Sequence, residues 1–186
     1  MEADWEVEIG GDAPVIDAAW AGLVDLRHSP QLAYQLPEAM DFPSVARVLM
    51  CLNAAGSPVW TSKCDVWAMP GAEQLDPDEL GSTAEDLRHA WGCYIDLLPR
   101  SSSQWNTQET AVSWCKGIIE RLHAIPLGCA RIDLIVRHAA IAGDALDTGI
   151  TAYGIGCGNS LEAAMVSLER ALYHFVDLLC SHSTVE

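Results

Sequence analysis

Basic residues are scarce in this sequence. The 186 residues include 10 Lys and Arg against 26 Asp and Glu, which gives a formal net charge of −16. A charge of this size repels phosphate backbones and anionic lipid headgroups, so we expect neither nucleic acid nor a membrane surface as a partner. The charge favours a basic protein partner, although many cytosolic proteins are simply acidic.

Signals for export and for disulfide bonding are also lacking. The N-terminus, Met-Glu-Ala-Asp-Trp-Glu, has neither the basic nor the apolar region of a secretory signal. No apolar run approaches the roughly 20 residues of a membrane span. The seven cysteines are odd in number and include no CxxC pair. We therefore expect free thiols and a cytoplasmic location.

Familiar motifs of catalysis and metal binding are missing as well. The sequence has no HExxH, CxxC or EF-hand pattern, no Walker loop and no GxGxxG. We accordingly predict no metal and no cofactor, and the sequence identifies no particular reaction.

The clearest structural signal runs from residue 131 to residue 180. Residues 131–137 alternate between charged and apolar side chains, which is the two-residue period of a half-buried strand. A second strand is predicted at 150–156. A glycine-rich turn then leads into a predicted helix at 160–180, whose apolar residues recur on one stripe.

Earlier segments extend this pattern into a complete domain. Strands are predicted at 59–67 and 91–98, and a helix at 107–123 that begins with a capping-box-like Asn106 and Glu109. Residues 91–180 therefore follow the order strand, helix, strand, strand, helix of a ferredoxin-like βαββα unit. We predict an α+β two-layer sandwich with an antiparallel or mixed sheet, with both helices on one face and 59–67 as a further strand.

The first 56 residues are predicted to form an N-terminal helical extension of that sandwich, which spans 57–186 within a single domain of 1–186. The extension contains a short candidate edge strand at 5–9 and candidate helices at 13–28 and 44–55. Two placements are open for these helices. They either cover the second face of the sheet or lie across one end of it.

A candidate binding surface follows from the strand alternation. If Ile132 and Leu134 point inward, then Arg131, Asp133 and Arg137 point outward. The same reasoning applies to the other strands. The candidate binding residues are Lys63, Asp65, Trp67, Tyr94, Asp96, Arg131, Asp133, Arg137 and Tyr153. One interpretation is a ligand or partner surface. The other is a solvated face with ion pairs worth up to about 1 kcal/mol each.

A second candidate lies in the glycine-rich turn before the last helix. Backbone N–H groups at such a helix start can bind an anion, and the candidate residues are Gly156, Gly158, Asn159 and Ser160. The alternative is that the glycines only allow a tight turn between strand and helix. Cys157 lies beside this helix start and would have a lowered pKa if exposed.

Two hypotheses for function remain. The first is a non-enzymatic cytoplasmic interaction module that binds a basic partner, as an immunity or antitoxin protein does, or that self-associates. The alternative is a small α+β enzyme or ligand-binding protein with its site on the open sheet face or near Cys157. A closed concavity in which Asp65, Asp96 and Asp133 converge, or one at Cys157, would favour the enzyme. A flat exposed face would favour interaction.

Overall fold

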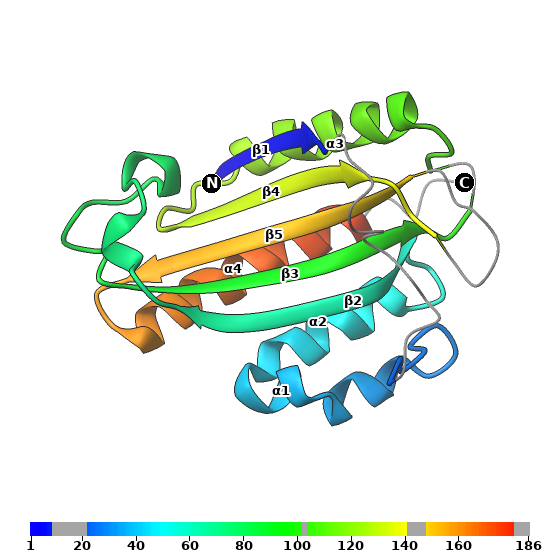
Figure 1. Ribbon diagram of the computed structural model, residues 1–186, viewed down its shortest axis with the longest axis horizontal. Helices are drawn as coiled ribbons and strands as arrows, with labels where there is room; N and C mark the ends of the chain where they lie inside the picture. The colour runs from blue at the N-terminus through cyan, green and yellow to red at the C-terminus, as the bar shows by residue number, and fades with distance from the viewer. Residues whose placement is uncertain (9–21, 102–103, 141–147, 181–186) are drawn as a thin grey trace.

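The computed structural model describes residues 1–8, 22–101, 104–140 and 148–180. It is a mixed α+β structure built on a five-stranded sheet (Figure 1). The strands are β1 (Glu2–Val7), β2 (Val59–Met69), β3 (His89–Pro99), β4 (Ala130–Arg137) and β5 (Gly149–Gly158). The helices are α1 (Pro37–Asp41), α2 (Pro43–Asn53), α3 (Gln108–His123) and α4 (Leu161–Cys180), with 3-10 turns η1 (Pro30–Gln35), η2 (Ala72–Gln74) and η3 (Asp78–Leu80).

The order of strands confirms the predicted mixed sheet but not the ferredoxin-like unit. The order is β1-β4-β5-β3-β2, with β1 parallel to β4 and the other neighbours antiparallel. The strand count and the order both differ from that prediction. Residues of the predicted N-terminal extension form β1, which is an edge strand of the sheet beside β4. Its inward residues alternate with acids, and the ring of Trp5 packs against Lys116 of α3, 4.8 Å from the ring centroid.

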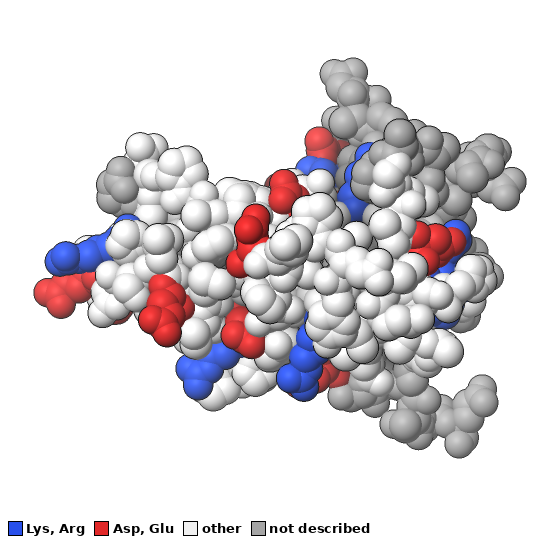
Figure 2. Space-filling model, turned by 90° about the horizontal axis from the view of Figure 1, so that it is seen from below, with Lys and Arg blue, Asp and Glu red and all other residues white. Residues whose placement is uncertain are grey.

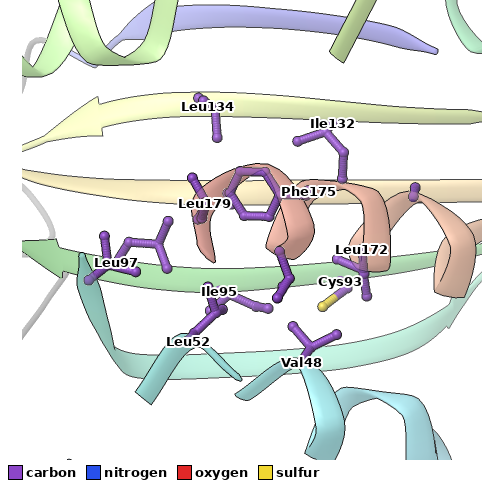
Figure 3. Packing of buried hydrophobic residues seen from close by; sticks show 14 of the residues in the cluster. Val48, Leu52, Cys93, Ile95, Leu97, Ile132, Leu134, Leu172, Phe175 and Leu179 are labelled. Carbon is purple, nitrogen blue, oxygen red and sulfur yellow. The ribbon is translucent and has the colours of Figure 1, made fainter. Parts of the chain in front are cut away.

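The α-helices of the described residues form one layer: in Figure 1, α4 lies behind the central strands, α3 lies along the β1 edge, and α1 and α2 lie beside the β2 edge. Helix α4 packs along β5, while α3 packs on β1 and β4, and α2 packs on α4 and β2. Figure 3 shows the shared core between this layer and the sheet, with Val48 and Leu52 from α2 and Leu172, Phe175 and Leu179 from α4 lying against Cys93, Ile95, Leu97, Ile132 and Leu134. Helix α2 therefore extends the helical layer and does not cover the second face. None of the described helices is both long and apolar enough to cross a bilayer.

The predicted helix at 13–28 is wrong where the structure describes it. Residues 13–21 lie outside the described residues, and residues 22–28 contain turns but no helix. Gly22 has a φ of 98°, which is outside the helical region. The Asp25 carboxylate accepts hydrogen bonds from both the backbone and the guanidinium of Arg27, and this local bonding competes with a helix.

The start of α3 also differs from the prediction. Its N-cap is Thr107, whose hydroxyl accepts from the backbone of Thr110, while the Thr110 hydroxyl accepts from the backbone of Thr107. The cap therefore lies one residue after the predicted Asn106. The physical reason is that Thr110, in place of an acidic residue, supplies the reciprocal bond.

Glycines on β5 determine how closely α4 approaches the sheet. A Cβ added to Gly156 would collide with the backbone nitrogen of Leu168 and lie 2.7 Å from the Ala164 carbonyl oxygen. One added to Gly158 would lie 2.6 Å from the backbone nitrogen of Ala164. The backbone of α4 therefore rests directly on β5, where no larger residue fits.

We predict that Gly156→Ala lowers the free energy of unfolding by about 3 kcal/mol, because backbone rather than a flexible side chain must move. Gly117→Ala is the matched control. Gly117 lies in α3, where an added Cβ would meet no atom within 4 Å other than its chain neighbours and the adjacent backbone of the helix, so its replacement should leave stability unchanged or raise it by up to about 1 kcal/mol. Urea denaturation measures both. Equal effects of the two changes would contradict the close contact between α4 and β5.

Candidate functional site

The face of the sheet opposite the helices, called the outer face here, carries a row of side chains that crosses the strands. Strand pairing places Asp65 opposite Tyr94, Tyr94 opposite Tyr153, and Tyr153 opposite Asp133. Asp133 in turn lies opposite Asp4 of the edge strand. This central row of five residues therefore has two tyrosines in its middle and carboxylates at both ends.

Three aromatic rings form a continuous strip on this face. The strip consists of Trp67, Tyr94 and Tyr153, all half-buried. The ring centroids are 6.3 Å apart between Trp67 and Tyr94 and 5.9 Å apart between Tyr94 and Tyr153. The Trp67 indole lies on Gly92, where an added Cβ would approach it to 2.7 Å. The indole of Trp67 therefore packs directly on the backbone of β3.

A shallow cavity of about 350 Å³ adjoins the strip at its β4 end, and the predicted residues that line it are Arg131, Asp133, Arg137 and Tyr153. Asp4, Glu6 and Ile155 also line it and were not predicted. The alternating acids of residues 2–6 were visible in the sequence. Their parallel pairing with β4, more than 120 residues away, was not.

Acidic side chains outnumber basic ones in and beside this cavity. The Arg131 guanidinium lies 2.7 Å from an oxygen of Asp133 and 3.9 Å from carboxylates of both Asp4 and Glu79. One cation is therefore shared by three carboxylates. Burial raises the pKa of Asp133, against the hydrogen bond from Arg131. Arg137 forms its own ion pair with Glu8.

The outer face is bounded at both ends of its strands. At one end the β2–β3 connection packs Leu80 and Leu87 over Ala90 and Cys157 in a small second core. At the other end the side chains of the outer face are buried; these are Trp60, Asp96, Leu98 and Thr151. Arg27 contributes to this cover, with its guanidinium 4.3 Å from the centroid of the Trp60 ring.

Two predicted residues lie outside the central row and the aromatic strip, and their surroundings differ from those of the others. Asp96 is only 2% exposed and accepts a 2.6 Å hydrogen bond from the Thr151 hydroxyl. Lys63 lies in an irregularity of β2, where the pairing register shifts between Thr61 and Cys64. The other seven predicted binding residues share the outer face, because strand alternation places them there.

The glycine-rich turn has a packing role that the sequence did not distinguish from anion binding. Gly156 and Gly158 are buried beneath α4, while Asn159 and Ser160 are exposed. The Ser160 hydroxyl already accepts from the backbone of Ala163. The turn therefore presents less free backbone to an anion than the prediction assumed.

Cys157 does not meet the condition for a lowered pKa, which was exposure. It is fully buried, and burial raises the pKa of its thiol to about 11. A thiol in that state is a poor nucleophile at neutral pH. None of the seven cysteines is paired in a disulfide. Among the described residues, no group of three or more His, Cys, Asp or Glu side chains is arranged to hold a metal ion.

A larger cavity, of about 470 Å³, lies at one end of the helical layer. Its lining includes Arg100, Trp114 and Ile118, and none of the predicted site residues. Arg100 donates to the carbonyl oxygens of Asn53 and Ser57 at 3.0 Å each, so its guanidinium joins the end of α2 to the loop that follows. This gives Arg100 a structural role.

Comparison with protein-family models, curated proteins and solved structures found no match to this chain.

The burial of Asp96 predicts a dependence of stability on pH. Burial raises the pKa of Asp96 from 3.8 to about 6, although Thr151, Arg137 and Lys63 act in the opposite direction. The folded state therefore holds this proton more tightly than the unfolded state does. The resulting stabilisation is complete below about pH 4 and is lost as the pH rises through about 6.

We predict that, between about pH 4 and about pH 7.5, the wild type loses about 2.5 kcal/mol of stability relative to Asp96→Asn. Asparagine can still accept from Thr151 but does not ionise. Urea denaturation across this range measures the difference. Asp65→Asn, an exposed carboxylate on β2, controls for the removal of one acid. A constant difference between wild type and Asp96→Asn would show that Asp96 does not titrate as its burial requires.

Proposed function

We propose that this protein is a non-enzymatic binding module of the cytoplasm that holds a basic partner protein on the outer face of its sheet. The observation that supports this most directly is the central row, in which half-exposed tyrosines lie between carboxylates. The helical layer covers the inner face of the sheet. The aromatic strip on the outer face is therefore not needed to pack the helices.

The aromatic strip suits a protein partner. Trp and Tyr dominate the energetics of protein interfaces because they offer large, rigid, amphipathic contact areas. Here Trp67 is supported by Gly92, and Tyr94 and Tyr153 support one another at 5.9 Å. Rings held in this way lose little conformational freedom on binding, which favours affinity.

The charges favour a basic partner. Asp4, Glu6 and Asp65 are exposed on the outer face, and Asp4 is 68% exposed. The pKa of Tyr94 is raised to about 12, first by burial and then by negative neighbours that include Asp96 and Asp65. In contrast, Figure 2 shows the side of the molecule on which α1 and α2 lie, where acidic and basic groups are interspersed without one dominant patch.

A heterologous partner is better supported than self-association. Both ends of the central row carry carboxylates, so two outer faces placed together would bring acids against acids whichever way the two rows run, and like charges directly opposite are destabilising. The overall charge of −16 adds to this repulsion. A basic protein would relieve both, which is the chemistry of an immunity or antitoxin protein with its target.

The alternative of a small enzyme receives less support. Strands lie about 4.8 Å apart, so Asp65 and Asp133, on strands three positions apart, are separated by about 14 Å. Asp96 is buried and Cys157 is covered by the second core. The predicted acids and the thiol therefore do not converge on one point.

Affinity capture from an extract of the source cells tests the proposal when the contact is also mapped. Wild type is compared with a double variant, Asp4→Lys and Asp65→Lys, which changes only exposed side chains. We expect wild type to capture a basic protein that cross-links to the outer face. We expect the double variant to capture about one tenth as much of that protein, or less. A matched control, Asp41→Lys and Glu120→Lys, makes the same charge change on the helical layer.

The proposal is contradicted if the two double variants retain the captured protein equally, or if the cross-links map to the helical layer. Tyr153→Ala gives a second measurement, because it removes one ring of the strip without changing charge. Tyr34→Ala is its control, since Tyr34 is 60% exposed in η1. Thermal melting of each variant verifies that it remains folded.

A further inference from the structure

The exposed part of the outer face is a band that runs across the strands. The second core closes one end of the strands, with Leu80 and Leu87 over Ala90 and Cys157. The other end is buried at Asp96, Leu98 and Thr151. Between these ends lie the aromatic strip and the central row, which reach from β2 to β1. A ligand that follows this band must cross the strands and cannot lie parallel to them.

The spacing of groups along the band matches an extended polypeptide. Side chains at positions i and i+2 of an extended chain are about 6–7 Å apart. The ring centroids along the strip are separated by 6.3 Å and 5.9 Å. Positions i and i+4 are about 12–14 Å apart, which matches the separation of about 14 Å between Asp65 and Asp133.

We propose that the partner is bound through an extended segment that crosses the band and carries two basic side chains four residues apart, with an apolar side chain midway between them. This inference rests on the proposed function and specifies the chemistry of its partner. One basic side chain meets Asp65. The apolar side chain lies between Tyr94 and Tyr153, and the second basic side chain meets Asp133 and Asp4.

Both ends of the central row can accept a cation. Asp65 is exposed on β2 beside the ring of Tyr94, and a cation near an aromatic face gains further attraction from the ring. At the other end, Arg131 is shared among Asp133, Asp4 and Glu79, so negative charge remains after its pairing. Glu6 is exposed on the same face and adds to that charge.

Two synthetic peptides of identical composition test the spacing. In GSRSLSRSG the arginines stand four residues apart with leucine midway, and in GSRRLSSSG they are adjacent. An acidic peptide, GSESLSESG, tests the sign of the charge. Isothermal titration at low ionic strength measures binding to the full chain. We expect the spaced peptide to bind at least about ten-fold more tightly than the adjacent one, and the acidic peptide not to bind.

Variants assign the preference to the central row. Asp65→Asn with Asp133→Asn should abolish the ten-fold preference. Asp41→Asn with Glu120→Gln removes two exposed acids from the helical layer, and this control should retain the ten-fold preference. Equal affinity for the two arginine peptides would overturn the inference, because it would show attraction by net charge alone. A preference that survives in the row variant would overturn it too.

The two proposals fail in different ways. If a captured basic protein is lost by Asp4→Lys with Asp65→Lys, but the peptides show no preference for spacing, the proposed function stands and the extended segment is wrong. If that capture is insensitive to the outer-face variant, the proposed function is wrong. A single-stranded oligonucleotide that binds the outer face more tightly than the spaced peptide would contradict both.

Discussion

The close contact between α4 and β5 determines where the other helices can pack and which face of the sheet is buried. Gly156 and Gly158 allow the backbone of the helix to rest on the strand, and the apolar stripe of α4 then fills the centre of the inner face. Helices α2 and α3 pack on either side of that position (Figure 1). The helical layer therefore covers one face of the sheet, where nearly all of the apolar burial takes place.

This one-sided arrangement leaves the outer face free to differ in chemistry. Side chains there stabilise the fold through ring contacts and partly exposed ion pairs, which contribute little compared with core burial. Trp67, Tyr94 and Tyr153 are large residues for such a position. The rings provide an apolar surface, and the neighbouring carboxylates make its surroundings negatively charged. An acidic, aromatic band on a rigid sheet is suited to binding a basic polypeptide.

The sequence predicted most strands and helices because periodicity is a local property. Alternation over 131–137 correctly separated Arg131 and Asp133 from the core residues beside them. It could not show which strands are neighbours, so the row from Asp65 to Asp4 was invisible. Pairing between β1 and β4 depends on contacts far apart in sequence. The same limit applies to Asp96, whose alternation is right but whose burial depends on what covers that end of the face.

The proposed binding role requires that the aromatic strip is accessible in the free protein while the helical layer covers the inner face. Hydroxyl-radical footprinting with mass spectrometry tests this residue by residue. We expect Trp67, Tyr94 and Tyr153 to be oxidised several-fold faster than the buried Trp105 and Phe175. Oxidation of all three strip residues as slowly as Trp105 would show that the outer face is covered and is not the binding surface.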